Sequence, residues 1–321
     1  MTHGFLLGKF MPPHAGHVVL CETARQSVGR LTILVCWLPG DPIPGPLRLA
    51  WMKALFPTCR VIGHDAIVPQ APEEHPDFWP IWGGIVRDAH PEPIDRLFAG
   101  EDYGKRLAEE VGAEFIQIGP RLHPGLSGSA VRADPWTHWR QLPEPVRPHF
   151  TRTICLHGPE STGKSTLSAP LAEHFDTIWV PEYGRVHCEV HGFDLDAAGL
   201  ITIARTQSAM TRAAMPWCNC RLIIDTDALT TAAWSLMILG HVPDGLLDDC
   251  PFADLYLLTD IDVPWEDDGT RYFPDPADRR RFMAACLRVL DEAGVDYVRI
   301  SGGNEDRLAE AIAAAEGLGP V

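Results

Sequence analysis

The sequence predicts an α/β protein with two domains, each built on a parallel β-sheet. Three observations support this fold class. Short apolar runs alternate with helix-like segments, which is typical of parallel strands joined by helices. The alternation occurs twice, and 321 residues exceed the length of one average domain. A segment rich in proline and aromatic residues, 134–150, separates the two series.

The elements follow one another in a regular order. In the first series we expect strands at 4–8, 31–37, 59–63, 94–100 and 114–119, with helices at 16–26 and 103–112. In the second series we expect strands at 153–157, 177–182, 221–227, 253–260 and 297–302, and a C-terminal helix at 305–317. We therefore predict a first domain of residues 1–147 and a second domain of residues 148–321.

Composition excludes several classes of protein. Hydrophobic residues make up 45% and charged residues 22%, as in globular proteins. A formal net charge of −16 argues against general nucleic-acid binding, which depends on clustered Lys and Arg. The nine cysteines are an odd number, and Cys21, Cys36 and Cys155 lie in apolar surroundings, which indicates free thiols in a reducing compartment. With no recognisable leader or membrane-length apolar stretch, we expect a cytoplasmic protein with no membrane or nucleic-acid partner.

The strongest motif is "GPESTGKS" at 158–165. It fits the phosphate-loop (P-loop) pattern G-x-x-x-x-G-K-[ST], with a strand before it and a helix after it. The backbone N–H groups of such a loop surround a polyphosphate, Lys164 reaches the outer phosphates, and the Ser165 hydroxyl completes a Mg²⁺ shell. We expect ATP and Mg²⁺ here, bound by Gly158, Pro159, Glu160, Ser161, Thr162, Gly163, Lys164, Ser165 and Thr166.

A P-loop also needs an acidic residue at the end of another strand to organise the metal. "RLIIDTD" offers Asp225 and Asp227, and we assign Asp225 to the metal site while keeping both as catalytic candidates. The alternation of side chains does not decide which carboxylate faces the site. A solvated strand end is the alternative.

Two further segments suit a kinase. "VPEYGR" at 180–185 places Glu182, Tyr183 and Arg185 after a strand, as candidate substrate contacts. Residues 266–282 carry Arg271 and the run 279–281, which could form a closing lid that brings an arginine to the transferred phosphate. For the run 279–281 an exposed basic helix start is an equal alternative. Pro170 lies about two turns into the helix after the P-loop, and we expect a kink there.

The first domain carries a different loop, "GKFMPPHAGH" at 8–17. If a strand ends near Gly8 and a helix starts near Ala15, then His14 lies at the helix start and His17 in its first turn, and both can face one anion. Lys9 adds a full positive charge, and Gly8, Phe10 and Gly16 complete the candidate site. A metal site lacks a third ligand nearby, and a purely structural role must explain the whole cluster. What remains is nucleotidyl transfer, with in-line attack on an α-phosphate.

This loop resembles the G-K-F-x-P-x-H-x-G-H motif of the nucleotidyltransferase superfamily with an H-x-G-H signature. The resemblance extends to "LSGSAVR" at 126–132, where related enzymes have I-S-G-T-x-I-R. The hydroxyl and guanidinium groups of this second motif suit the β- and γ-phosphates of ATP. They come from Ser127, Gly128, Ser129 and Arg132.

The order of motifs narrows the family. A transferase loop followed by a P-loop, with "GEDYG", "PEYGR" and "DTDALTTAAWS", is similar to bifunctional nicotinamide-mononucleotide adenylyltransferase and ribosylnicotinamide kinase. The resemblance implies a Rossmann-like nucleotidyltransferase domain before a P-loop kinase domain. The first domain would join ATP and nicotinamide mononucleotide (NMN) into NAD and pyrophosphate, with His17 on the α-phosphate and Lys9 and His14 on the triphosphate. The second would phosphorylate nicotinamide riboside, leaving Asp225, Asp227 and Glu182 as candidates for metal, substrate or base roles.

The sequence departs from this family in two places. Relatives often have an acidic residue near Gly119, and some begin with a helix-turn-helix region that we do not find here, so we expect no repressor role. Trp79 and Trp82 could stack on a nicotinamide or adenine ring. Together with Ile85 they also suit the core-facing stripe of a helix.

Rival functions remain open from the sequence. A fused pantetheine-phosphate adenylyltransferase and dephospho-coenzyme A kinase has a related order of domains, and fused flavin enzymes are a weaker rival. A nucleotide-sensing regulator with one inactive site is a different class. Intact Lys9, His14, His17, Lys164 and Ser165 argue against an inactive site. Assembly into a homo-oligomer is left open.

Overall fold

The computed structural model describes residues 1–118, 125–266 and 271–320. Gly119 therefore lies outside the described residues, as do residues 267–270 of the expected lid. The chain divides into two compact units, Met1–Val146 and Arg147–Val321. Each unit has its own five-stranded sheet with helices around it. The predicted α/β fold class, with two parallel sheets, is confirmed.

In the first unit, every strand pairing in the sheet is parallel. Its strands are β1 (His3–Gly8), β2 (Arg30–Cys36), β3 (Arg60–His64), β4 (Arg96–Ala99) and β5 (Glu114–Gln117), in the order β3-β2-β1-β4-β5. Its helices are α1 (Ala15–Ser27), α2 (Gly45–Leu55), α3 (Phe78–Ala89), α4 (Tyr103–Val111) and α5 (Gly128–Ala133). The chain builds outward from β1 to β3 and then crosses over to β4. The strand order thus reverses beside β1, which is where doubly wound sheets bind ligands.

The strands β1 and β2 at the middle of this sheet are buried on both faces, which explains their long apolar runs. Leu6 and Ile33 pack with residues of α1 and α2, whereas Phe5 and Leu34 pack with residues of α3 and α4. The core therefore occupies the two faces of the sheet. The loops at the carboxyl ends of the strands are left to form a site.

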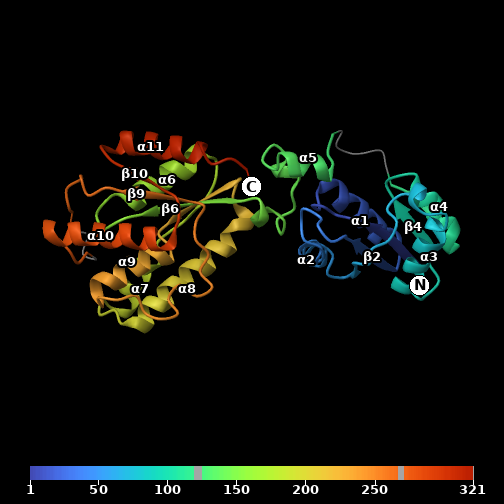
Figure 1. Cartoon of the computed structure of the whole chain (residues 1–321), viewed down its shortest axis with the longest axis horizontal. Helices are drawn as coiled ribbons and strands as arrows, with labels where there is room; N and C mark the ends of the chain where they lie inside the picture. Colours follow the sequence, from blue (N-terminus) through green and yellow to red (C-terminus); the bar gives the residue numbers. More distant parts are fainter. Residues whose placement is uncertain (119–124, 267–270, 321) are drawn as a thin grey trace. The chain divides into compact units, whose positions relative to one another are not determined.

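In the second unit, the strands are likewise all parallel. They are β6 (Arg152–His157), β7 (Trp179–Val180), β8 (Arg221–Asp225), β9 (Leu255–Thr259) and β10 (Tyr297–Ile300), in the order β10-β9-β6-β8-β7. The helices are α6 (Lys164–His174), α7 (Tyr183–His191), α8 (Ala197–Ala214), α9 (Ala228–Ile238), α10 (Pro276–Ala293) and α11 (Asn304–Glu316). Helices α6 and α11 cover one face of the sheet, and α8, α9 and α10 lie on the other side (Figure 1).

Two prolines, Pro170 and Pro181, each remove a backbone hydrogen-bond donor from a regular element or its end. Pro170 lies inside α6, and the helix continues past it. Because proline has no N–H, the carbonyl of Thr166 loses its usual helical partner. The strand expected at 177–182 is only two residues long, since Pro181 follows directly after Val180 and has no N–H for the sheet.

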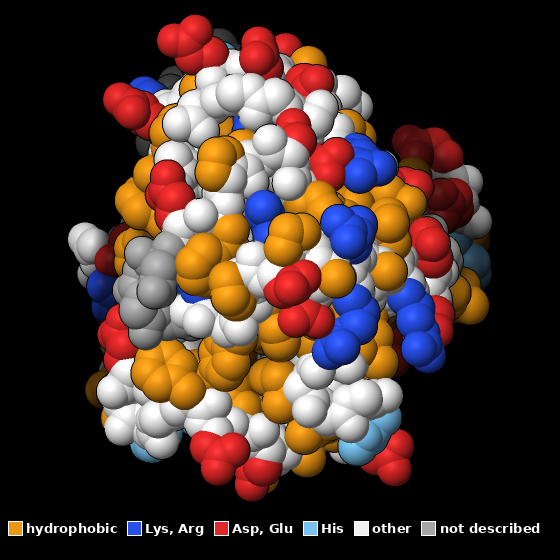
Figure 2. Space-filling view, turned by 90° about the vertical axis from the view of Figure 1, so that its left-hand side faces the viewer, with side chains coloured by type: hydrophobic (Ala, Val, Ile, Leu, Met, Phe, Trp, Pro, Cys, Tyr) orange, Lys and Arg blue, Asp and Glu red, His pale blue; other side chains and the backbone are white. Residues whose placement is uncertain are grey.

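The surface is mixed in charge. On the face that Figure 2 shows, basic side chains lie among acidic and hydrophobic ones. Within the described residues, no helix combines the length and the apolar character that crossing a membrane requires.

Candidate active sites

The first candidate site lies in the loop between β1 and α1. His14 is the N-cap residue of α1, and His17 is in its first turn. Their rings stack with centroids 3.8 Å apart, and the ring of Phe10 packs edge-on against His17 at 5.1 Å. A Cβ at Gly16 would lie 3.1 Å from the ring of His14, so a larger residue would press against the stack. The structure thus brings the two predicted histidines together at a helix N-terminus.

The second predicted motif of this unit reaches the same loop. A Cβ at Gly128 would lie only 2.5 Å from the carbonyl oxygen of Met11, so only glycine allows this close approach. Arg132 Nη1 donates to the same carbonyl. Ser127 caps α5 by accepting a hydrogen bond from the N–H of Ala130 at 3.1 Å. The motif is therefore built around the loop rather than lying elsewhere on the domain.

A cavity of about 650 Å³ lies between these two motifs. Its lining includes predicted residues from both motifs, namely Gly8, Lys9, Phe10, His14, Gly16, His17, Ser127 and Gly128. Glu101 and Tyr103 of the "GEDYG" segment contribute the wall after β4. Ser129 and Arg132 are not among the residues that line this cavity. Arg132, which we expected on the phosphates, braces the Met11 loop in this structure.

The electrostatics of His17 differ from those of a surface histidine. Burial, and secondarily the neighbouring His14, lower the pKa of His17 to about 3. Its Nδ1 is buried without a hydrogen-bond partner among the described residues, although the residue as a whole is partly exposed. A ring with this pKa is neutral at pH 7.

Arg48, which no sequence pattern predicted as a site residue, holds the loop between β1 and α1. Its side chain is fully buried and donates to the carbonyl of Lys9 at 2.6 Å, to the carbonyl of Ile43 at 3.0 Å and to Asp41 at 2.5 Å. An arginine on a helix gives no sequence signal for this role, because its partners are backbone carbonyls brought close only by the fold.

The packing of Trp79 and Trp82 does not suit the stacking on a nicotinamide or adenine ring that we considered. Trp82, on α3, is 8% exposed, packs in the core cluster with Phe5 and Leu34, and donates from its indole N–H to the carbonyl of Pro69 at 2.9 Å. Trp79 packs against the same cluster. Neither is among the residues that line the cavity at His17. This packing matches the core-facing alternative.

The second candidate site is the loop between β6 and α6. A Cβ at Gly158 would lie 2.6 Å from Oγ1 of Thr259 on β9, and the residue has φ of 140°, so the loop requires glycine there. Ser161 also has a positive φ, of 58°. Lys164 Nζ donates to the carbonyls of Gly158 at 3.0 Å and Pro159 at 2.8 Å, which curls the loop around the ammonium group.

The structure separates the two aspartates after β8. Asp225 is 3% exposed at the strand end, beside Ser165, Lys164 and Arg185. Burial raises its pKa, and these three neighbours oppose the increase. Its Oδ1 is buried without a hydrogen-bond partner in the described part of the chain. This carboxylate faces the P-loop, as expected for the metal-site candidate.

Asp227 instead serves the fold. Its Oδ1 caps α9 by accepting from the N–H groups of Leu229 at 3.0 Å and Thr230 at 3.2 Å, and its Oδ2 accepts from the hydroxyl of Tyr256 at 2.5 Å. Both oxygens are therefore engaged away from the P-loop. Because both oxygens are engaged in this way, the packing argues against the catalytic role predicted for Asp227. The backbone turns between the two aspartates, at Thr226, which has φ of 74°.

The Glu160 side chain has a role that the motif did not predict. It is 7% exposed, and its carboxylate accepts from the N–H of Tyr272 at 2.9 Å and from that of Phe273 at 2.5 Å. Arg271, the predicted lid arginine, donates to Ser161 Oγ and to the carbonyl of Glu266. The segment that carries Arg271 is thus attached to the P-loop itself.

The three arginines of the run 279–281 have different environments. Arg280 and Arg281 are exposed on α10, and Arg281 pairs with Asp278 at 3.6 Å, as the alternative of a basic helix start describes. Arg279 turns inward and donates to the carbonyl of Val263 at 3.0 Å.

A cavity of about 300 Å³ is lined by the P-loop, by the "PEYGR" segment and by Arg271. Of the "PEYGR" residues, Glu182 and Arg185 line it, whereas Tyr183 does not. Gln207 holds this turn by accepting from the N–H of Tyr183 at 2.8 Å and donating to the carbonyl of Pro181 at 3.2 Å. Residues that sequence analysis missed also form the wall, namely Gln207, Thr226, Thr230, Trp234 and Tyr272. Three of them, Thr226, Thr230 and Trp234, lie in the segment "DTDALTTAAWS", which carried part of the family resemblance.

Comparisons with known proteins bear on the whole chain. A curated relative from Escherichia coli (strain K12), the trifunctional NAD biosynthesis/regulator protein NadR, is 29% identical, and the match covers 95% of this chain and 80% of the relative. The chain is thus similar to NadR over most of its length. A family model described as an AAA domain matches residues 153–307, which include the loop between β6 and α6.

Two solved NadR structures share the fold. A crystal structure of NadR protein in complex with NR superimposes with a TM-score of 0.78 at 20% identity, covering 98% of this chain and 95% of that one. A second, in complex with NAD and AMP-PNP, gives a TM-score of 0.76 at 21% identity with the same coverage. Both units therefore have the NadR fold.

Proposed function

We propose that this chain is a bifunctional enzyme of NAD synthesis. Residues 1–147 transfer AMP from ATP to NMN, and residues 148–321 phosphorylate nicotinamide riboside with ATP. The observation that carries this proposal is the presence of two separate phosphate loops, each at the carboxyl end of a central parallel strand and each beside its own cavity. The NadR relatives, with the NR, NAD and AMP-PNP named for their structures, support the choice of substrates.

In the first unit, an oxygen of the NMN phosphate attacks the α-phosphorus of ATP, the bond to the β-phosphate oxygen breaks, and pyrophosphate leaves. Negative charge grows on the non-bridging oxygens during this step. We assign their stabilisation to His17, with Lys9 and His14 on the triphosphate. The N-terminus of α1 adds its N–H groups, since unpaired N–H groups there favour phosphate.

In the second unit, the riboside hydroxyl attacks the γ-phosphorus and ADP leaves. Lys164 and the loop N–H groups bind the phosphates, and Arg271 approaches them from the attached segment. Glu182 lines the cavity and is our candidate acceptor for the hydroxyl proton, beside Arg185. Trp234 and Tyr272 line the same cavity and pack edge-on against each other, with ring centroids 5.6 Å apart, so they offer an aromatic wall for the nicotinamide ring.

The residues at the P-loop are suited to bind Mg²⁺. The Oδ1 of Asp225 is buried without a protein partner among the described residues, and Ser165 lies beside the carboxylate. Oxygen ligands of this kind, together with substrate phosphates, are what Mg²⁺ prefers. When bound, the ion neutralises charge on the phosphates. The use of ATP and the buried free thiols Cys21, Cys36 and Cys155 support a cytoplasmic location.

Product analysis tests both activities at once. The full chain is incubated with MgATP and nicotinamide riboside, and chromatography should show NMN, NAD, ADP and pyrophosphate. Dephospho-coenzyme A in place of the riboside should drive no ATP consumption. Formation of neither NMN nor NAD at any enzyme concentration would overturn the proposal.

Two variants assign the activities to the units. Lys164→Ala should lower riboside phosphorylation by orders of magnitude and leave NAD formation from supplied NMN near wild type. Lys53→Ala, at an exposed lysine on α2, is the control. If Lys164→Ala abolished both activities in a folded protein, one shared nucleotide site would replace the two-site proposal.

A further inference from the structure

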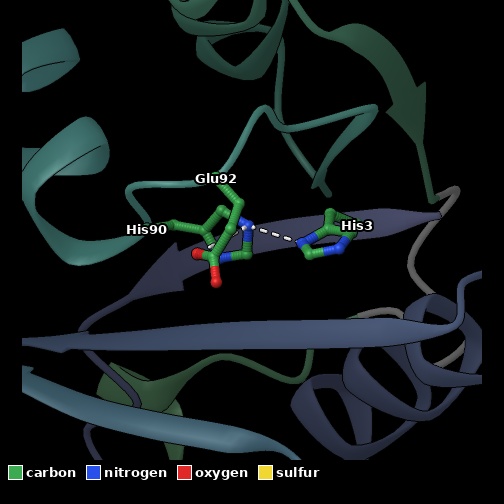
Figure 3. A group of neighbouring side chains, drawn as sticks. All are labelled: His3, His90 and Glu92. Atoms are coloured by element: carbon green, nitrogen blue, oxygen red, sulfur yellow. Dashed lines mark hydrogen bonds and ion pairs between the residues drawn. The ribbon is translucent and has the colours of Figure 1, made fainter. Parts of the chain in front are cut away.

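A cluster of possible metal ligands lies at the amino-terminal end of β1, opposite the end that leads to His14 and His17. His3 is the first residue of β1, His90 follows α3, and Glu92 lies in the loop before β4. One ring nitrogen of each histidine and one carboxylate oxygen all lie within 4.8 Å of one another. Figure 3 shows the carboxylate in front of the His90 ring, with His3 at its side.

Two of the three distances between possible ligand atoms are close to those that a small metal ion requires. His3 Nδ1 is 3.1 Å from His90 Nε2, and His90 Nε2 is 3.9 Å from Glu92 Oε2. Two ligands of a tetrahedral Zn²⁺, each at about 2.0–2.1 Å, are roughly 3.4 Å apart. Each of the two pairs therefore differs from this geometry by about half an ångström or less. Glu92 is 47% exposed at its side chain, so it can make the adjustment by rotation.

The contacts behind the ligands hold them in place. His90 is 3% exposed, and its Nδ1 is 2.9 Å from Thr32 Oγ1 on β2, which leaves Nε2 directed at the cluster. His3 is fixed by two backbone contacts with Asp95, whose Oδ2 accepts from the His3 N–H at 2.6 Å and whose N–H donates to the His3 carbonyl at 2.9 Å. A hydrogen bond from the second ring nitrogen is the usual means of orienting a metal-binding histidine.

We propose that His3, His90 and Glu92 bind a divalent transition-metal ion, for which Zn²⁺ is the probe. Two imidazoles and one carboxylate are a ligand set for this class of ion rather than for Mg²⁺. The ion fastens the start of β1 to the loop before β4.

The surroundings leave room for a further ligand. A cavity of about 400 Å³ adjoins the cluster and is lined by Arg25, Arg30 and Arg60 besides the three ligands. Arg25 is held by Glu22 at 2.5 Å, whereas Arg60 lies 4.0 Å from Glu92 Oε2. The open coordination position thus takes water or a small anion. Arg60 competes with the metal for the Glu92 carboxylate.

The test is calorimetric titration of Zn²⁺ into tag-free, chelator-treated full-length protein without nucleotide. His3→Gln and Glu92→Gln should each weaken binding at least about tenfold, since even outer contacts of metal ligands are worth 10–100-fold. His75→Gln, at an exposed histidine of the same unit, should bind as wild type. Arg60→Gln should tighten binding several-fold, which a merely damaged fold would not do.

Thermal unfolding supplies a second measurement. Zn²⁺ should raise the unfolding temperature of the wild type but not of His3→Gln, because an ion that binds only the folded state stabilises it. Wild-type affinity in both His3→Gln and Glu92→Gln would overturn the proposal. So would zinc binding that is lost only in His17→Gln, because the ion would then belong to the other histidine pair.

Discussion

The imidazole rings of His14 and His17 stack with their centroids 3.8 Å apart and their planes inclined by 28°. Two cations would repel each other strongly at this distance, and burial already disfavours the charged form. The pKa of His17 is accordingly lowered to about 3 by burial and by His14. A neutral ring donates a hydrogen bond to phosphate without having to take up a proton first.

The first prediction concerns this neutral ring. His17→Ala should lower NAD formation from NMN by about 10²-fold or more, as the loss of an oxyanion donor does. The ratio of wild-type to variant turnover should stay constant from pH 8 to pH 6, because His17 does not titrate in that range. Steady-state rates across the range measure this ratio. An inflection near pH 6.5 would show that His17 acts as a cation.

The second prediction separates the two aspartates after β8. Asp225→Asn should lower riboside phosphorylation by at least about 10²-fold without lowering stability, because it weakens the carboxylate ligand that we propose for Mg²⁺ at the phosphates. Asp227→Asn should retain activity but lose about 2 kcal/mol of stability, since its carboxylate accepts from the Tyr256 hydroxyl. Turnover and urea unfolding of both variants check this. The reverse pattern would return the catalytic role to Asp227.

The third prediction concerns the attachment of Arg271. Glu160→Gln weakens the acceptor for the N–H groups of Tyr272 and Phe273, so the segment that carries Arg271 is held less firmly. We expect kcat/KM for riboside phosphorylation to fall about tenfold, the worth of one charge-assisted hydrogen bond. Glu173→Gln, at an exposed residue of α6, is the matched control. Equal activity of the two variants would contradict a role for this attachment.

The fourth prediction follows from His157, which is fully buried at the end of β6. Burial, with the nearby charge of Lys164, lowers its pKa to about 3. Below pH 6.5 the unfolded chain therefore takes up a proton that the folded chain does not. Stability contributed by the neutral ring is complete above pH 6.5 and is lost as the pH falls toward 3, by up to about 1.4 kcal/mol per pH unit.

His157→Asn removes this titration and keeps a hydrogen-bonding side chain for the Thr230 hydroxyl, which is 2.9 Å from His157 Nδ1. Between pH 6.5 and pH 5 the variant should lose about 2 kcal/mol less stability than the wild type. Urea unfolding at the two pH values measures the difference. His241→Asn, at an exposed histidine, should behave as wild type, and an equal acid loss in wild type and His157→Asn would refute the prediction.

The strands and loops show how much of the fold local sequence patterns can predict. Apolar runs such as 153–157 predicted β6 to within one residue, because a strand buried on both faces must be apolar throughout. The strand at 177–182 was predicted too long, since the effect of Pro181 on strand pairing was not weighed. In the same way, glycines and histidines at fixed spacing predicted two loops that the structure places at strand ends.

The sequence by itself determined the α/β class, the two phosphate loops and their order along the chain, because these depend on periodicity and on the short-range geometry of glycine, lysine and histidine. Only the tertiary structure decided that Asp225 faces the P-loop while Asp227 caps a helix. It also decided that Glu160 holds the Arg271 segment, and that His3 meets His90. Each of these depends on the direction of a side chain toward residues distant along the chain, and packing sets that direction, which local sequence does not encode.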